Sequence, residues 1–273
     1  MEKKKINIST IQINTVIRDK KTNFKKIKKI LSEVKQTDII VLPEVWSTGW
    51  VCEDFVNISE ELENSETVKF LAEIAKEKNS NIIGGSFITK RDNKYYNTCP
   101  ILNRQGKLIG LYDKMHLYSY YGSEEGQYLT QGENPIIIDI EGIKIGLTIC
   151  YDIRFPELFR AYRLAGADII TNVAAWSNTK PIPWDAMTKS RAIENQTFLV
   201  AANQVGPIFE KDYNLGHSRI IDYNGNILSE IKDIEGVINS DLNLEDMYQF
   251  REKCTILKDL KKSYEVNVIW KKY

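Results

Sequence analysis

The sequence predicts an α/β protein built as a sheet-on-sheet sandwich with helices on the outside. Strand-like and helix-like segments alternate along all 273 residues, with no Pro/Gly/Ser-rich linker between them. Residues 37–46 (TDIIVLPEVW) and 167–176 (ADIITNVAAW) each follow a predicted helix, begin with Asp-Ile-Ile and end at a tryptophan. Two such helix–strand layers would stack as a sandwich, although parallel strands buried on both faces of one sheet would show the same local pattern. We expect one domain over residues 1–273.

The first elements are a strand, a helix and a second strand. Residues 5–14 alternate between apolar and polar side chains, which predicts a strand. Residues 22–36 carry apolar side chains at helical spacing, and the lysines that crowd the first thirty residues alternate with them, which is typical of a solvated helix face. Residues 38–42 (DIIVL) form a short buried strand that runs into Pro43.

Further along, Ser65 can cap a helix whose apolar side chains lie on one face. Residues 81–88 predict a strand, and a hairpin through residues 103–106 leads into a strand over 107–112. A second hairpin is indicated by apolar residues 136–140, a Glu-Gly turn and apolar residues 143–149.

Pro156 suits the first turn of a helix over residues 157–165, and Gly166 is placed to end it. From residue 245 onward apolar residues have no clear period. We expect residues 245–273 to form a tail that packs on its own subunit or on a neighbour.

Composition excludes several classes of function. Thirty-seven basic residues balance 37 acidic ones, so the chain has no general attraction for nucleic acid or anionic membranes. No apolar run has the length of a membrane helix and no signal-type core follows the N-terminal lysines, so we expect a cytoplasmic protein. Four scattered cysteines and two histidines lack the spacing of a zinc site, and we expect no metal.

Cys150 is a candidate nucleophile because a buried strand ends there and a helix begins about six residues later. A thiol on such a turn lies near backbone N–H groups that stabilise negative charge. The alternative is that Cys150 is a small buried apolar residue, as most intracellular cysteines are.

Two charged residues also follow strands. Glu44 comes after the apolar DIIVLP run, where partial burial would raise its pKa toward that of a general base. Lys114 lies just past the strand over 107–112, where an ammonium could stabilise an oxyanion. Taken singly, each residue fits a structural role better than a catalytic one.

Three motifs combine these residues: LPEVW at 42–46, YDKMHL at 112–117 and CYDIRFPEL at 150–158. In this order they resemble the three catalytic motifs of the nitrilase superfamily of carbon–nitrogen hydrolases. The resemblance continues through RAIENQ at 191–196 to GHSR at 216–219. It covers nearly the whole chain and is strongest to the omega-amidase branch.

The resemblance implies a four-layer αββα sandwich with two central mixed sheets, and subunits that pair helix to helix into a homodimer or higher homo-oligomer. It assigns Glu44 as general base, Lys114 as the oxyanion-stabilising cation and Cys150 as the nucleophile. Counting back from a family glycine places a second glutamate at Glu125 rather than Glu124. No cofactor is required by this chemistry.

Three further residues are expected to contact substrate. The backbone N–H of Tyr151 would help hold the oxyanion, Arg154 could bind a substrate carboxylate or brace the site, and Trp176 could line the pocket or belong to the core. The implied substrate is a small amide that bears a carboxylate, such as a 2-oxo acid omega-amide, hydrolysed through a Cys thioester with release of ammonia.

Three alternatives remain open at this point. N-carbamoyl hydrolysis would use the same Glu-Lys-Cys site on a ureido group. A Cys–His dyad that includes His116 would move the base role to an imidazole. A non-catalytic binding protein could retain the fold, and loss of one of the three residues would favour it, but all three are present.

Overall fold

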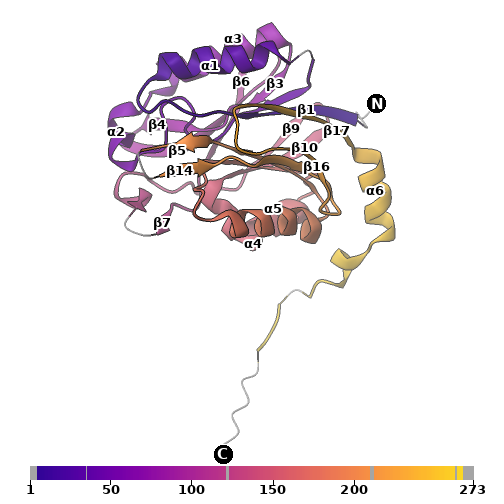
Figure 1. Cartoon of the computed structure of the whole chain (residues 1–273). Helices are drawn as coiled ribbons and strands as arrows, with labels where there is room; N and C mark the ends of the chain where they lie inside the picture. The colour runs from indigo at the N-terminus through magenta and orange to yellow at the C-terminus, as the bar shows by residue number, and fades with distance from the viewer. Residues whose placement is uncertain (1–4, 35, 121–122, 210–211, 262, 267–273) are drawn as a thin grey trace, which may run out of the picture.

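The computed structural model describes residues 5–34, 36–120, 123–209, 212–261 and 263–266. Within these ranges the strands form two large mixed sheets that stack face to face, and helices cover the outer face of each sheet (Figure 1). The four-layer αββα sandwich expected from the sequence is therefore confirmed. None of the described helices has the length and apolar character needed to cross a membrane.

The first sheet contains the N-terminal strands. Its order is β17 (Gly236–Asn243), β1 (Lys5–Gln12), β2 (Ile39–Val41), β3 (Asn81–Ile83), β5 (Lys94–Leu102) and β4 (Phe87–Arg91), with β6 (Leu108–Asp113) also paired to β5. Strands β1, β2 and β3 are parallel to one another, and β17 lies antiparallel beside β1. Among the described residues, the sheet therefore brings the last strand next to the first.

The second sheet holds the strand that leads to Cys150. Its order is β16 (Ile227–Ile231), β15 (Ser218–Ile221), β12 (Phe198–Asn203), β11 (Ile169–Ala174), β10 (Ile143–Ile149) and β9 (Ile137–Ile140). Strands β10, β11 and β12 are parallel. The two similar sequence segments noted above thus supply β2 and β11, each lying inside its own sheet between two parallel neighbours.

Helices α1 (Lys20–Ser32) and α3 (Glu66–Lys78) cover the first sheet, and α4 (Pro156–Leu164) and α5 (Pro181–Asn195) cover the second (Figure 1). The Ser65 side chain accepts a hydrogen bond from the Val68 N–H at 3.0 Å, which confirms the predicted cap of α3. Helix α1 begins two residues earlier than predicted, because Asp19 caps it by accepting from the Thr22 N–H. The remaining short elements are η1 (Cys52–Asp54), α2 (Phe55–Ile58), η2 (Leu62–Asn64), β7 (Ser119–Tyr120), β8 (Ser123–Glu124), η3 (Glu125–Gln127), η4 (Cys150–Arg154), β13 (Val205–Pro207), β14 (Tyr213–Leu215), α6 (Leu244–Lys253) and η5 (Ile256–Asp259).

The core is layered in the same way as the fold. Side chains such as Ile8, Ile39 and Leu147 fill the space between the two sheets. A second cluster packs α1 and α3 against the first sheet, and a third, which contains Phe159 and Trp184, packs α4 and α5 against the second. This burial of apolar surface fixes both sheets, and therefore the strand ends that carry the charged residues.

Two local predictions need correction. The expected strand over 81–88 is interrupted at Gly84–Ser86, so that β3 and β4 are separate strands. Strands β4 and β5 then form a hairpin through Asp92 and Asn93, both of which have positive φ (49° and 60°), as type I′ turns require. The predicted hairpin between β9 and β10 is confirmed, with Glu141 and Gly142 in its turn.

The first part of the C-terminal region is a helix and not the irregular tail that was expected. Residues 244–253 form helix α6, whose Leu244 and Met247 are buried. Beyond η5 the chain leaves the body of the molecule, and the side chains of Tyr264 and Val266 are exposed (Figure 1). Residues 262 and 267–273 of the predicted tail lie outside the described residues.

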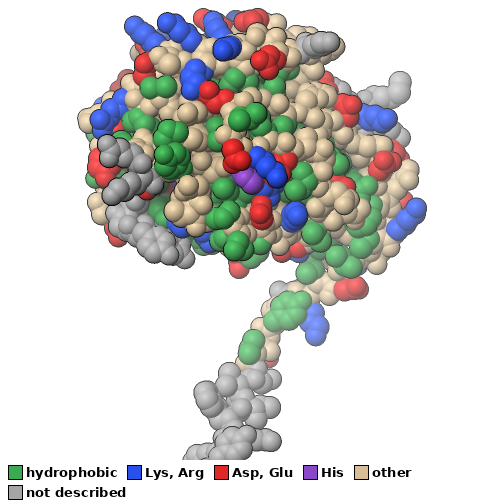
Figure 2. Space-filling view, viewed as in Figure 1, with side chains coloured by type: hydrophobic (Ala, Val, Ile, Leu, Met, Phe, Trp, Pro, Cys, Tyr) green, Lys and Arg blue, Asp and Glu red, His purple; other side chains and the backbone are tan. Residues whose placement is uncertain are grey.

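The surface carries both signs of charge. Figure 2 shows lysine and arginine side chains over α1 and α3, mixed with acidic ones. Lys26 lies 2.7 Å from Glu235 and Lys20 lies 2.9 Å from Glu60. The lysine-rich N-terminal helix is therefore a solvated face with acidic partners, as its sequence pattern indicates.

Candidate active site

Glu44 lies in the loop that follows β2, and its side chain is fully buried. Its Oε1 atom accepts hydrogen bonds from Lys114 Nζ at 2.8 Å and from Asn97 Nδ2 at 2.9 Å. Its Oε2 atom accepts from the backbone N–H of Ala175 at 2.9 Å. The carboxylate is thus held by groups from both sheets.

The loop around Glu44 packs tightly against the segment of the same chain that contains Gly85 and Ser86. Gly85 has a φ of +66°, and a Cβ atom placed there would lie 2.0 Å from the carbonyl oxygen of Pro43. Ser86 Oγ accepts from the N–H of Val45 at 3.1 Å, and Gln204 Nε2 donates to the Glu44 carbonyl. A glycine at position 85 is therefore required for the loop to lie where it does.

Lys114 follows β6, and only 1% of its side chain is exposed. Its Nζ lies 2.8 Å from Glu44 Oε1 and 2.8 Å from Glu125 Oε2, so one ammonium bridges two carboxylates. Burial opposes the charge on Lys114, but Glu125 and Glu44 outweigh it and raise the pKa of Lys114 well above its ordinary value. The ammonium remains charged at neutral pH.

Glu125, at the start of η3, is fully buried, whereas the side chain of Glu124 is exposed and bonds to Gln127. Glu125 Oε1 accepts from Trp50 Nε1 at 3.0 Å, and Oε2 accepts from the Tyr118 N–H at 2.7 Å. The structure thus places Glu125, and not its neighbour, against the lysine.

Cys150 begins η4 directly after β10, with a φ of 44°. A positive φ is uncommon for a residue with a Cβ, and it turns the chain sharply so that the side chain lines the cavity beside Lys114. The strand-to-helix turn expected from the sequence is present, with a short 3-10 helix before α4.

Burial and the adjacent carboxylates control the protonation of Cys150. Burial is the main cause that raises the pKa of the thiol well above its ordinary value; Glu44 adds to it, in part by a hydrogen bond, and Lys114 opposes it. Burial also raises the pKa of Glu44, while Lys114 lowers it. A protonated thiol therefore faces a carboxylate that can accept its proton.

Asp152 connects the Lys114 and Cys150 segments. This buried carboxylate accepts from the N–H of Ile149 at 2.9 Å, from Tyr112 OH at 2.7 Å and from the N–H of His116 at 3.0 Å. His116 Nδ1 lies 2.7 Å from the same carboxylate, and its ring stacks on Phe155 with centroids 3.7 Å apart. His116 therefore braces the turn, as its position in the motif indicates.

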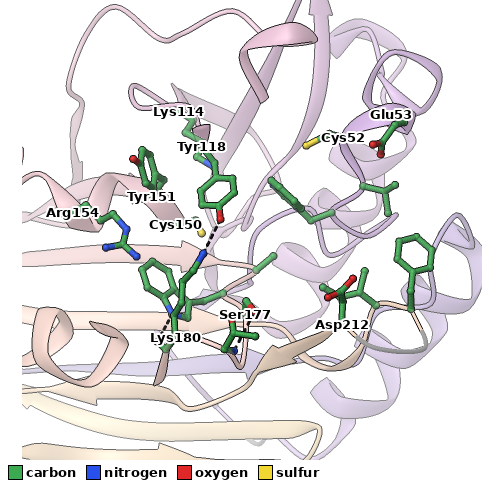
Figure 3. Close-up of a pocket in the computed structure, with 17 residues that line it drawn as sticks. Cys52, Glu53, Lys114, Tyr118, Cys150, Tyr151, Arg154, Ser177, Lys180 and Asp212 are labelled. Carbon is green, nitrogen blue, oxygen red and sulfur yellow. Dashed lines mark hydrogen bonds between the residues drawn. The ribbon is translucent and has the colours of Figure 1, made fainter. Parts of the chain in front are cut away.

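The site opens into a cavity of about 730 Å³ (Figure 3). Lys114 and Cys150 line it, and the three residues predicted to contact substrate, Tyr151, Arg154 and Trp176, line it as well. The Arg154 guanidinium lies 4.9 Å from the centre of the Trp176 ring. Trp176 is 4% exposed, so it belongs to the core and to the cavity wall.

Several residues of the site were not singled out in the sequence. Asn97 donates a hydrogen bond to Glu44. It is a polar residue within the largely buried strand β5, and a polar residue among buried ones is the sequence pattern that could have indicated its role. Lys180 lines the cavity from the loop after β11, and Cys52 lines it from η1, where burial raises the pKa of its thiol to about 12. Neither residue lies in a segment with a periodic sequence pattern from which its place in the cavity could be predicted.

This arrangement is suited to acyl transfer. It combines a thiol, a buried carboxylate that can accept and return the proton of the thiol, and a cation next to both. These groups come from the ends of strands in two different sheets, so their spacing depends on the stacking of the sandwich.

Comparison with known proteins agrees with this chemistry. The model of the family described as carbon–nitrogen hydrolase matches residues 7–252. The chain is 32% identical to the 2-oxoglutaramate amidase of Bacillus subtilis (strain 168), over 94% of this chain and 98% of that protein. It is 29% identical to the omega-amidase NIT3 of Saccharomyces cerevisiae, over 93% of this chain and 92% of that protein.

Solved structures show the same fold. Saccharomyces cerevisiae Nit3, described as a member of branch 10 of the nitrilase superfamily, superimposes with a TM-score of 0.84 at 29% identity, covering 92% of this chain and 94% of that one. XC1258 from Xanthomonas campestris, described as a CN-hydrolase superfamily protein, superimposes with a TM-score of 0.88 at 25% identity, covering 96% and 99%.

Proposed function

Since the chain belongs to the carbon–nitrogen hydrolase family, we propose that it hydrolyses the omega-amide of a small 2-oxo acid and releases ammonia. The family predicted from the LPEVW, YDKMHL and CYDIRFPEL motifs is confirmed by this membership. One observation carries the proposed reaction: Cys150 and Lys114 line one cavity, and the buried Glu44 carboxylate contacts the Lys114 ammonium and interacts with the Cys150 thiol.

The choice of substrate is supported by the relatives. Proteins named 2-oxoglutaramate amidase and omega-amidase are 29–32% identical to this chain over most of its length. The Arg154 cation that lines the cavity suits a substrate with a carboxylate. The proposed substrate is therefore a short linear amide with an anionic group at the end opposite the amide.

In the first half of the reaction Cys150 Sγ attacks the amide carbon, and the thiol proton passes to Glu44. The amide oxygen gains negative charge, which Lys114 and the backbone N–H of Tyr151 stabilise. The C–N bond then breaks, and Glu44 returns the proton to the departing nitrogen, which leaves as ammonia. An acyl thioester on Cys150 remains.

In the second half, water attacks the thioester carbonyl while Glu44 accepts one of its protons. The C–S bond breaks, the thiolate takes the proton back from Glu44, and the carboxylic acid product leaves. Glu125 keeps Lys114 in place through its contacts at 2.8 and 3.0 Å. The scheme uses groups of this protein and water, and needs no metal or organic cofactor.

Ammonia release from a panel of substrates tests the proposal. The panel contains 2-oxoglutaramate, glutamine, β-ureidopropionate and a simple nitrile, and 2-oxoglutaramate is expected to react fastest. Preference for β-ureidopropionate would instead identify an N-carbamoyl hydrolase. Failure to hydrolyse any member would favour a binding protein that retains the fold.

Variants of the cysteines test the mechanism. Cys150→Ala and Cys150→Ser are expected to abolish ammonia release, and an unchanged rate in either variant would exclude Cys150 as nucleophile. Cys254→Ser is the matched control, because Cys254 is a free cysteine outside the cavity lining. Its rate should equal that of the unmodified protein.

We further propose that the protein works as a homodimer or larger homo-oligomer in the cytoplasm. Apolar side chains stand exposed on the outer helices, with Ile182 at 78% and Leu164 at 65% exposure, and pairing of these helices would cover them. A reducing compartment would keep the Cys150 thiol free to react. Light scattering of the purified protein measures the oligomeric state directly.

A further inference from the structure

We propose that Lys180 and Arg154 form an anion subsite that selects acyl chains with a negatively charged end, and that Lys180 is its specificity-determining residue. The inference rests on the proposed function for the nature of the reaction, but the subsite itself is argued from the cavity. Both side chains line that cavity together with Cys150.

Lys180 is held in a defined position. Its Nζ donates a hydrogen bond to Tyr118 OH at 2.7 Å and lies 4.9 Å from the centre of the Tyr118 ring. Its backbone carbonyl accepts from Trp176 Nε1 at 2.8 Å, which fixes the base of the side chain. Figure 3 shows the ammonium reaching across to Tyr118, with the sulfur of Cys150 nearby.

Trp176 joins the two cations of the subsite. Its indole N–H holds the Lys180 backbone, and the Arg154 guanidinium lies 4.9 Å from the centre of its ring. Trp176 is itself buried against Trp184, with ring centroids 5.5 Å apart. Because the supporting ring is fixed in the core, both cations are preorganised in the cavity that Cys150 also lines.

Tyr118 connects the subsite to the carboxylate–lysine cluster. The Tyr118 N–H donates to Glu125 Oε2 at 2.7 Å, and the Glu125 N–H donates to the Tyr118 carbonyl at 3.0 Å. Glu125 in turn contacts Lys114. Tyr118 therefore contacts both Lys180, the cation that would bind the substrate carboxylate, and Glu125, the carboxylate that holds Lys114.

Charge within the cavity is unevenly distributed. Among the described residues that line it, the acidic ones, Glu53 and Asp212, lie on the opposite side of the view from Arg154 (Figure 3). An acyl chain with a carboxylate would be attracted toward Lys180 and Arg154 and repelled from the acidic side. This arrangement orients an anionic substrate, whereas a neutral amide would gain no such preference.

A matched pair of substrates isolates this effect. Succinamate and methyl succinamate share one carbon chain and one amide, but the ester removes the negative charge. In Lys180→Met the ratio of kcat/KM for succinamate to kcat/KM for methyl succinamate is expected to fall about tenfold, as loss of one charge contact of about 1.4 kcal/mol would produce. Lys180→Glu should lower this ratio further and should favour 4-aminobutanamide, whose free end is positively charged. Lys180→Arg should keep most of the ratio of the unmodified protein.

Lys189→Met is the control, because Lys189 is an exposed lysine of α5, the helix that begins just after Lys180. Its ratio should equal that of the unmodified protein. An unchanged ratio in Lys180→Met, or an equal fall in Lys189→Met, would overturn the subsite.

A second readout does not depend on turnover. Glutarate should slow the alkylation of Cys150 by iodoacetamide, and Lys180→Met should need about ten times more glutarate for the same protection, again the effect of about 1.4 kcal/mol. Protection without amide hydrolysis would support the subsite and contradict the proposed function. Hydrolysis of amides without protection would support the reaction and contradict the subsite.

Discussion

His116 Nδ1 lies 2.7 Å from the Asp152 carboxylate, and this contact joins the segment that carries Lys114 to the turn that carries Cys150. The imidazole is further occupied by stacking on Phe155. A Cys–His dyad needs an imidazole that faces the thiol, whereas this one faces a buried carboxylate. The carboxylate that interacts with the thiol is that of Glu44.

Substitution of Lys114 and His116 separates these two mechanisms. Lys114→Met is expected to lower kcat by about 10²–10³, the usual effect of removing an oxyanion-stabilising group. His116→Asn should lower it by less than about tenfold, because an amide N–H can still donate to Asp152. Steady-state ammonia release measures both variants, with circular dichroism to verify folding. The opposite order of the two effects would support the Cys–His dyad.

The pH dependence of kcat/KM should show the raised pKa of Glu44. The base must be ionised, and it is protonated below its pKa, so activity falls as the pH decreases through that value. Because burial raises the pKa of Glu44, this fall begins above the ordinary range of a glutamate. Lys114 keeps its charge at much higher pH, so no loss of its proton limits the neutral range.

A pH–rate profile with buffers of constant ionic strength measures this limb. Glu44→Gln should lower kcat/KM by a factor of about 10²–10⁴ at all pH values, which is the contribution usual for a general base. Glu124→Gln is the control, since this exposed carboxylate should leave the profile unchanged. A profile that is flat down to the ordinary pKa of glutamate would contradict the assignment of Glu44.

Asp152→Asn tests the connection between the two segments. The carboxylate accepts from Ile149, Tyr112 and His116, and an amide would present N–H groups to some of these donors. Leaving buried donors unsatisfied should lower the free energy of unfolding by about 2–4 kcal/mol and also lower kcat. Denaturant unfolding and ammonia release measure both. Asp233→Asn, at a side chain that is 82% exposed, should change neither quantity.

Gly85→Ala tests the packing under Glu44. A Cβ at this position would lie 2.0 Å from the Pro43 carbonyl and would displace the loop. The variant should lose more stability than the roughly 1–2 kcal/mol that a positive φ costs a residue with a side chain, and its kcat should fall. Gly142→Ala isolates the φ effect, because Gly142 also has a positive φ but has nothing within 4 Å. Equal unfolding midpoints for the two variants would contradict the packing argument.

The sequence predicted the central residues of the site because each one follows a strand. Glu44 and Cys150 come after apolar runs, Lys114 comes directly after β6, and the motifs around all three identify a family. Lys180 could not be found in this way. It lies in a loop where its role depends on Tyr118 and Trp176, residues 62 and 4 positions away that only the folded chain brings into contact.

The helices and strands that could be predicted are those whose buried apolar side chains recur with a regular period on one face. Helix α6 was missed because only Leu244 and Met247 of its ten residues are buried, which is too sparse a stripe to show a helical period. The break between β3 and β4 was missed because apolar residues lie on both sides of the Gly-Gly-Ser segment at 84–86, and the bend at Gly85 depends on contact with a distant loop.

Glu44, Lys114 and Glu125 place one positive and two negative charges together in a buried cluster. In the proposed reaction the thiol proton moves to Glu44, so a negative charge disappears from the carboxylate and appears on sulfur, and then on the oxygen beside Lys114. The total charge of cysteine, cluster and bound amide is therefore the same at every step. Charge moves only a short distance among groups whose positions are fixed. The surrounding water molecules therefore need little reorientation while bonds are made and broken.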